Sequence, residues 1–236
     1  FNRTLYMKLA ALFSGGKDST YSIYKAKQMG HDVKCLITVF PKSANSHLLH
    51  SPNIELTKLQ SETLKIPQII SLTNNDDWTE EMIVLKTLLD KAKFDFKIEG
   101  LVHGGISSEF QKKCFEKICK EKGLKTITPL WKINSKEYMN SLLNSNFKFI
   151  LSSVSSGGLD ETWLGKIISA DDISELDKLS TKYGFNLNFE GGEAETFVID
   201  CPLYSHPIKI TKSKVVWDGY IGRFEIEDAH LDSNAR

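Results

Sequence analysis

A glycine turn between two regular segments near the start of the chain constrains the fold more than any other feature. Residues 9–13 form a short apolar run, residues 14–19 read Ser-Gly-Gly-Lys-Asp-Ser, and apolar residues then recur at helical spacing up to residue 29. This order predicts a buried strand, a tight turn and a helix. Adjacent glycines let the backbone approach a ligand closely, and the start of a helix presents N–H groups with about half a positive charge. The turn is therefore predicted to bind phosphate.

The polar side chains of this turn indicate that the phosphate is bound together with a cation. The hydroxyls of Ser14 and Ser19 and the ammonium of Lys17 add hydrogen-bond donors. Asp18 is the unusual member, because a carboxylate about 4 Å from a phosphate costs about 4 kcal/mol at an effective dielectric of about 20. A Mg²⁺ ion shared between Asp18 and the phosphates would compensate for this repulsion. The turn is not a Walker A motif, since Lys17 is not followed by Ser or Thr.

Strand-like and helix-like segments alternate over the first half of the chain. Strands are predicted at residues 9–13, 33–40, 68–72, 100–103 and 125–127. Helices are predicted at residues 19–29, 52–65 and 78–92, and between an N-cap at Ser107 and Gly123. This alternation predicts a parallel sheet covered by helices on both faces, here assigned to a domain at residues 7–132. The ligand crevice of such a sheet lies at the carboxyl ends of its strands, where the glycine turn falls.

The pattern changes in the second half, which is predicted to be a smaller α+β domain at residues 133–236. Helices are predicted at residues 135–144 and 173–183, and strand-like segments at residues 147–153, 196–200, 208–217 and 220–226. We expect this domain to supply the contacts to the substrate.

The second domain carries a cluster of acidic residues next to a glycine pair. Glu190, Glu193 and Glu195 lie within six residues, around Gly191 and Gly192. Clustered carboxylates can hold Mg²⁺, accept a proton from attacking ammonia or attract a cationic substrate. A solvated acidic turn in front of the next strand is the alternative.

Charge, hydropathy and cysteine content exclude other classes. The 30 basic and 30 acidic residues cancel, which argues against a dedicated nucleic-acid binder. The lysine-rich stretch at residues 112–125 is predicted to be the solvated face of a helix, with a macromolecular docking patch as the alternative. No apolar run approaches the roughly 18 residues that span a bilayer, so we expect no membrane association. The four cysteines include no CxxC pair, so we expect free thiols in a reducing, cytoplasmic setting.

The glycine turn resembles that of the PP-loop ATP pyrophosphatases, which share Ser-Gly-Gly-x-Asp-Ser between the first strand and the first helix. The resemblance covers about residues 8–131 and implies the HUP-type α/β fold of that superfamily. It also implies that the loop grips the β,γ-pyrophosphate of ATP. A substrate oxygen would then attack the α-phosphorus and become adenylated, with AMP and pyrophosphate as products.

Three further blocks are similar to the diphthine–ammonia ligase (diphthamide synthetase) family. They lie at residues 104–111, continuing to Pro-Leu-Trp at 129–131, at residues 157–165, and at residues 190–203. The family amidates the carboxylate of diphthine, a modified histidine on the translocation elongation factor, using ATP and ammonium. The resemblance therefore implies ATP and Mg²⁺ as cofactors, and the diphthine-bearing elongation factor and ammonium as partners.

The resemblance also assigns roles to residues. The implied contacts to ATP are Ser14, Gly15, Gly16, Lys17, Asp18, Ser19, Gly104 and Gly105. The implied contacts to the substrate are Asp160, Glu161, Trp163, Glu190, Gly191, Gly192, Glu195 and Thr196. Asp18 is predicted to be the metal ligand and, with Glu193, a catalytic residue. The ring of Trp163 could face the trimethylammonium group of diphthine. Ala194 and Cys114 depart from the family's usual aromatic residue and arginine.

Two alternatives use the same loop. A tRNA-modifying enzyme that transfers sulfur needs a cysteine nucleophile, for which Cys201 near the acidic block is the residue to test. A non-catalytic ATP sensor would bind ATP without releasing pyrophosphate. The sequence leaves open the general base, the ammonia source and the oligomeric state, a homo-oligomer included.

Overall fold

The computed structural model describes residues 5–41, 51–74 and 77–235 of the chain. The chain divides into two compact units. One contains the chain up to Ser14 together with Asp18–Trp131, and the other contains Gly15–Lys17 together with Lys132–Arg236. Three residues of the glycine turn thus pack with the second unit although both ends of the turn belong to the first. Within the described ranges, no helix combines the length and the apolar character needed to cross a membrane.

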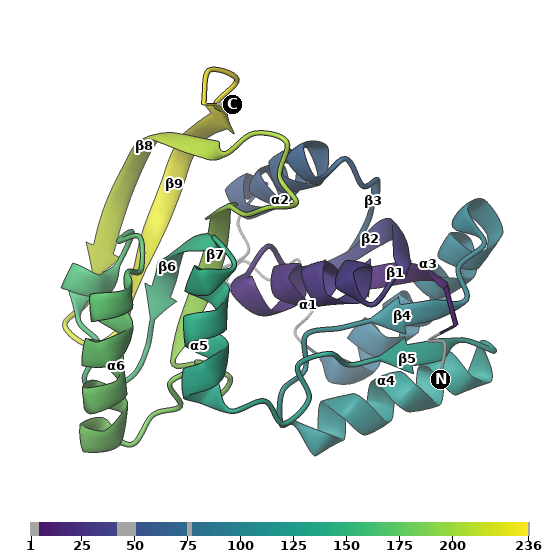
Figure 1. Ribbon diagram of the computed structural model, residues 1–236, viewed down its shortest axis with the longest axis horizontal. Helices are drawn as coiled ribbons and strands as arrows, with labels where there is room; N and C mark the ends of the chain where they lie inside the picture. Colours follow the sequence, from purple (N-terminus) through teal and green to yellow (C-terminus); the bar gives the residue numbers. More distant parts are fainter. Residues whose placement is uncertain (1–4, 42–50, 75–76, 236) are drawn as a thin grey trace. The chain divides into compact units, whose positions relative to one another are not determined.

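The first unit is built on a five-stranded parallel sheet in the order β3-β2-β1-β4-β5 (Figure 1). Its strands are β1 (Lys8–Leu12), β2 (Asp32–Pro41), β3 (Gln68–Thr73), β4 (Gly100–Val102) and β5 (Lys125–Ile127). The helices that connect them are α1 (Lys17–Gln28), α2 (Ser51–Leu64), α3 (Trp78–Phe96) and α4 (Glu109–Glu121). The predicted alternation of strands and helices is confirmed, and the α/β class with it.

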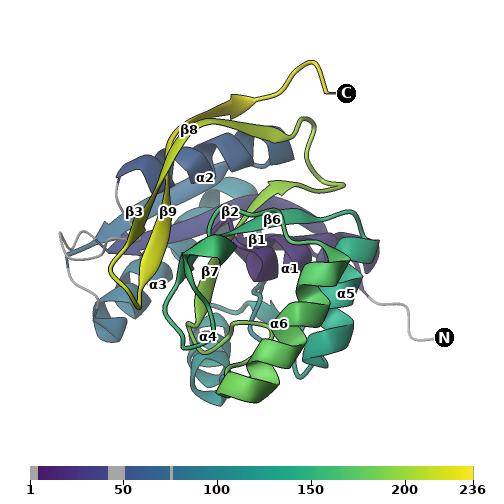
Figure 2. The same ribbon diagram turned by 90° about the vertical axis from the view of Figure 1, so that its left-hand side faces the viewer.

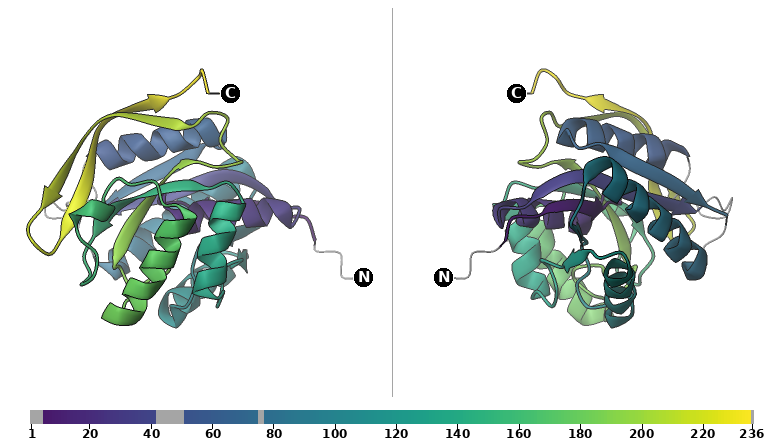
Figure 3. Two further views of the ribbon diagram at one scale, coloured as in Figure 1. Left: turned by 60° about the vertical axis from the view of Figure 1, so that its left-hand side comes forward. Right: turned by 90° about the vertical axis from the view of Figure 1, so that its right-hand side faces the viewer.

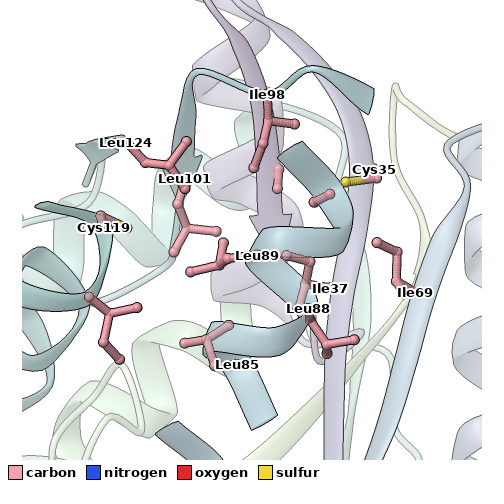
Figure 4. Close-up of a cluster of buried hydrophobic side chains, with 13 residues drawn as sticks. Cys35, Ile37, Ile69, Leu85, Leu88, Leu89, Ile98, Leu101, Cys119 and Leu124 are labelled. Atoms are coloured by element: carbon pink, nitrogen blue, oxygen red, sulfur yellow. The ribbon is translucent and has the colours of Figure 1, made fainter. Parts of the chain in front are cut away.

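Helices cover both faces of this sheet. Right-handed crossovers in this strand order place α1 and α2 on one face and α3 and α4 on the other, and Figure 2 shows α2 and α3 on opposite sides of the sheet. A hydrophobic core fills the space between the sheet and the second pair of helices. Leu85 and Leu89 of α3 pack there with Ile37 of β2, Leu101 of β4 and Cys119 of α4 (Figure 4). The spacing of the leucines by four residues gives α3 the apolar stripe that this packing requires.

The register of the central strands brings two loops to one edge of the sheet. In the parallel pair of β1 and β4, Ala11 lies opposite Val102, so the residues that follow both strands emerge together. The backbone N–H of Phe13 donates to the carbonyl of Ile37 at 2.9 Å. The hydroxyl of Thr38 donates to the carbonyl of Phe13 at 2.8 Å. These bonds hold the start of the glycine turn against β2.

Helix α4 begins one residue later than the sequence predicts. The predicted N-cap is Ser107, but the side chain that caps the helix is that of Ser108, which accepts the backbone N–H of Gln111 at 3.3 Å. Neighbouring serines have the same capping chemistry, so only the path of the chain distinguishes them.

The second unit contains a four-stranded antiparallel sheet in the order β7-β6-β9-β8. Its strands are β6 (Lys148–Val154), β7 (Ala194–Asp200), β8 (Ile208–Trp217) and β9 (Gly222–Leu231). Its helices are α5 (Ser135–Asn144), α6 (Ala170–Tyr183) and the short 3₁₀ helix η1 (Glu161–Trp163). Helices α5 and α6 pack side by side, and β8 and β9 form a long two-stranded ribbon (Figure 3). The predicted smaller α+β part is confirmed; η1 was not predicted.

Candidate functional site

The two ends of the glycine turn lie in the first unit, directly after β1. The Oγ of Ser19 accepts the backbone N–H of Ser14 at 3.2 Å and lies 3.3 Å from the Ser14 hydroxyl oxygen. Gly15 has a φ of +81°, in the left-handed region that glycine adopts at little cost. Asp18 is half-buried in the first turn of α1. The two serine hydroxyls therefore close the turn on itself in front of the helix.

The glycine pair after β4 lies against this turn. A Cβ on Gly104 would be 2.7 Å from the carbonyl carbon and oxygen of Asp18 and 3.0 Å from the backbone nitrogen of Ser19. A Cβ on Gly105 would be 2.8 Å from the ring of His103. Within the first unit, the structure therefore brings Gly104 against Asp18 and Ser19 at the end of the glycine turn, and only a residue without a side chain fits at position 104.

His103, between β4 and the glycine pair, is buried with 2% of its surface exposed. Its Nδ1 accepts the backbone N–H of Gly105 at 3.1 Å, so the neutral ring carries its proton on Nε2. Burial lowers the pKa of His103 from its ordinary value of 6.5 to about 4, and of its charged neighbours Glu116 raises it and Lys112 lowers it. The Nε2 has no hydrogen-bond partner among the described residues. A neutral, buried N–H donor thus lies at the carboxyl edge of the sheet.

The middle of the glycine turn packs against β7 of the second unit. The backbone N–H of Val198 donates to the carbonyl of Gly15 at 3.0 Å. The backbone N–H of Lys17 donates to the Oγ1 of Thr196 at 3.0 Å. Thr196, which the sequence assigns to the substrate, therefore contacts the turn that the sequence assigns to ATP. The exposed Glu195 precedes it on the same strand.

The Lys17 side chain is enclosed within the second unit and is only 1% exposed. Its Nζ donates to the backbone carbonyl of Asn188 at 2.6 Å. The same nitrogen lies 5.3 Å from the centre of the Tyr138 ring and 5.8 Å from that of Phe189. Its predicted contact with phosphate remains a prediction.

Glu193, predicted to be catalytic, holds the loop that carries the acidic cluster. Its Oε1 accepts the backbone N–H of Asn186 at 2.9 Å and the side-chain amide of Asn186 at 2.8 Å. A Cβ on Gly191 would lie 2.6 Å from this oxygen, so the glycine makes room for the carboxylate. The other oxygen, Oε2, is buried without a partner among the described residues. Glu193 thus has one oxygen in a structural contact and one buried oxygen without a partner among the described residues.

The block at residues 157–165 forms the η1 corner. Asp160 caps η1 by accepting the backbone N–H of Thr162 at 3.0 Å. Trp163 is 9% exposed, and the Nζ of Lys166 lies 5.2 Å from the centre of its ring. One face of the indole therefore already has a cationic partner. Glu161 is exposed. The substrate contacts predicted for this block remain predictions.

The cysteines are free thiols, and three of the four are buried. All four cysteines are free, and Cys201 is 1% exposed. Burial raises the pKa of the Cys35 thiol to about 12 and also raises that of Cys119. Throughout residues 5–41, 51–74 and 77–235, no group of three or more His, Cys, Asp or Glu side chains is arranged to hold a metal ion. The burial of Cys201, the residue named for the sulfur-transfer alternative, weighs against that alternative.

A parallel sheet with a glycine turn at the carboxyl end of its first strand, followed by a helix N-terminus, is the arrangement with which many α/β proteins bind a phosphate-bearing ligand. Two family models match the chain: the diphthamide synthase N-terminal domain at residues 7–126 and the diphthamide synthase C-terminal domain at residues 134–231. The chain belongs to the diphthamide synthase family.

Several curated relatives cover most of the chain. A protein named diphthine–ammonia ligase from Homo sapiens is 31% identical over 89% of this chain and 85% of its own length. The protein of the same name from Mus musculus is 32% identical over the same shares. That from Schizosaccharomyces pombe is 29% identical over 89% of this chain and 37% of its own length. The predicted family and the predicted enzyme class, a ligase, are confirmed.

Three residues of the site region were not singled out from the sequence. His103 could have been noticed as a polar residue between a buried strand and a glycine pair. Nothing in the sequence singles out Asn186 and Asn188, because asparagine is common in loops, where its side chain hydrogen-bonds the nearby backbone. Their partners, Glu193 and Lys17, become visible only in the folded chain.

We expect Gly104→Ala to destabilise the protein by about 1–3 kcal/mol, because the new Cβ has no room beside the Asp18 backbone. The same change should reduce the thermal shift produced by ATP. Gly157→Ala is the matched control, since its Cβ would have no neighbour closer than 3.9 Å. Thermal unfolding with and without ATP measures both effects. A Gly104→Ala protein as stable as the control would contradict the close approach.

We also expect His103 to make stability depend on pH. Its pKa is about 4 in the folded protein and 6.5 ordinarily, so the unfolded state binds more protons between these values. This contribution is complete above pH 6.5 and is lost as the pH falls towards 4, up to about 3 kcal/mol. His103→Gln should flatten the dependence in that window, whereas His230→Gln, at an exposed position, should not. Denaturant unfolding across the window measures the slope, and equal slopes in both variants would contradict the assignment.

Proposed function

We propose that this protein amidates the carboxylate of diphthine on the translocation elongation factor, using ATP and ammonium, to form diphthamide. Family membership and the names of the relatives support this reaction class. The observation that carries the proposal for the site is the contact of Gly15 and Lys17 with Val198 and Thr196. Gly15 and Lys17 belong to the predicted ATP loop, and Val198 and Thr196 lie on the strand that follows the acidic cluster, so this contact supports a joint role for the two segments. The carboxylate would be activated by adenylation, with release of AMP and pyrophosphate.

The proposed ATP site consists of the glycine turn and the loop after β4. Its residues are Ser14, Gly15, Gly16, Asp18, Ser19, Gly104 and Gly105. Backbone N–H groups and serine hydroxyls suit the oxygens of a pyrophosphate leaving group, because they donate without adding bulk. The close contact of Gly104 with the Asp18 backbone supports one shared surface for the nucleotide. The neutral Nε2–H of His103 offers a further donor at this edge of the sheet.

Asp18 fits a magnesium ion that is shared with ATP. Mg²⁺ in nucleotide sites usually takes one or two carboxylates, with phosphate oxygens and waters completing its shell. When bound, the ion would reduce the repulsion between Asp18 and the phosphates and neutralise charge on the leaving group.

The acidic cluster is proposed to handle the substrate and the ammonium. Glu193 is proposed as the base, because its Oε2 is buried without a partner among the described residues while Asn186 fixes the other oxygen. A carboxylate held in this way keeps its orientation, which general-base catalysis needs. The remaining proposed substrate contacts are Asp160, Glu161, Trp163, Glu190, Gly191, Gly192, Glu195 and Thr196.

The reaction is tested by incubating the protein with ATP, Mg²⁺, ammonium and an elongation factor that carries diphthine. We expect the factor to show the mass change of replacing OH by NH₂, with AMP and pyrophosphate in equal amounts. Intact-mass spectrometry and nucleotide chromatography measure the products, and an elongation factor with unmodified histidine is the control. Formation of ADP and phosphate would contradict the PP-loop chemistry. Tight ATP binding without any amidation would favour the sensor.

A matched pair of variants separates the two tasks of Glu193. Glu193→Gln removes the charge, and if the carboxylate is the base the amidation rate should fall by about 10²–10⁴ while ATP affinity changes little. Asn186→Ala removes the side-chain hydrogen bond to Glu193 but keeps the backbone one and the carboxylate, so its rate should fall less. Single-turnover rates and ATP dissociation constants measure the difference. Equal losses in both variants would show that Glu193 acts only by holding the loop.

A further inference from the structure

The Lys17 side chain is built into a polar and aromatic cage rather than directed to solvent. It ranks among the largest fully buried side chains of the described residues. Its Nζ donates to the Asn188 carbonyl at 2.6 Å and faces the rings of Tyr138 and Phe189 at 5.3 and 5.8 Å. An ammonium between a carbonyl oxygen and aromatic faces is stabilised there by hydrogen bonding and by cation–π attraction. Contact with a phosphate oxygen would have to compete with these interactions.

The residue that accepts from Lys17 is the centre of a second set of bonds. The side-chain oxygen of Asn188 accepts the backbone N–H of Glu190 at 3.0 Å, and its amide donates to the Ser135 hydroxyl at 3.0 Å. Asn188 therefore joins three segments: the glycine turn through Lys17, the N-terminus of α5 through Ser135, and the start of the acidic cluster through Glu190. The next residue, Phe189, has a φ of +62°, a strained value for a residue with a side chain.

We propose that Lys17 is a positioning residue, which holds the turn at Asn188 and Phe189, and with it the acidic cluster, in place beside the phosphate turn. Its backbone N–H donates to Thr196, directly after the acidic cluster, and its ammonium donates to Asn188, just before the cluster. Lys17 therefore holds both ends of the cluster. Lys17 thus acts on catalysis through Phe189 and Glu190 and not by binding phosphate. The catalytic part of this inference rests on the proposed function.

The test is a double-mutant cycle between the two sides of the cage. Lys17→Met keeps the length of the side chain and removes its charge, and Phe189→Leu removes one aromatic face. Lys25→Met is the matched control, because Lys25 lies on the same helix with its Nζ 5.6 Å from the Tyr21 ring. ATP dissociation constants, amidation rates and unfolding free energies are measured for the two single variants, the double variant and the control.

We expect Lys17→Met and Phe189→Leu each to keep the ATP dissociation constant within about threefold and to lower the amidation rate constant by about 10–100-fold. The double variant should be at most about threefold slower than the slower of the two single variants, because both substitutions remove the same contact. The control should match wild type in rate and affinity. A purely structural role would lower the melting temperature and leave rate and affinity unchanged, which would overturn the proposal.

A phosphate-binding lysine gives a different pattern. Lys17→Met would then weaken ATP binding by more than about 30-fold, Phe189→Leu would not, and the two effects would multiply. ATP affinity and the unfolding cycle need no elongation factor. If the wild-type protein fails to amidate the factor, the proposed function is wrong. Non-additive unfolding free energies with unchanged ATP affinity would still support the role of Lys17 in the cage. Additive unfolding free energies, or a loss of ATP affinity, would overturn that role.

Discussion

Two hydrogen bonds between the glycine turn and β7 are the constraint on which the rest of the site depends. They run from Val198 to the Gly15 carbonyl and from Lys17 to the Thr196 hydroxyl. Each is worth only about 0.5–1.5 kcal/mol net, but together they fix the path of a loop whose glycines would otherwise leave it many conformations.

The charged residues of the site also stabilise the fold, because their buried polar atoms need hydrogen-bond partners. A buried donor or acceptor without a partner costs about 1–3 kcal/mol, so the chain satisfies most of them. Lys17 meets this requirement at the Asn188 carbonyl, and Glu193 meets half of it at Asn186. The buried side-chain atoms that lack a partner among the described residues include the Oε2 of Glu193 and the Nε2 of His103. Such buried atoms without a partner are candidates for ligand contacts.

Much of the fold could be predicted from the sequence, because its signals are local. Apolar runs of strand length, helical spacing and glycines at the boundaries are read over a few residues, and they predicted the strands and helices of both units, though not η1 or the cap at Ser108. The Ser-Gly-Gly-Lys-Asp-Ser turn predicted a strand–turn–helix, and the structure has it between β1 and α1. The ordered family blocks led to the diphthamide synthase family, which the family models confirm.

The sequence by itself thus determined the α/β class, the glycine turn and the family, since residue types and their spacing encode these directly. Only the tertiary structure decided what the site residues contact. It enclosed Lys17 between Tyr138 and Phe189, tied Glu193 to Asn186, and gave Gly104 its close contact with the Asp18 backbone. The physical reason is separation along the chain: Lys17 lies 179 residues from Thr196 and 171 from Asn188. Sequence spacing carries no information about partners so far apart. Whether a polar side chain binds a ligand or stabilises the fold depends on the neighbours that folding brings to it.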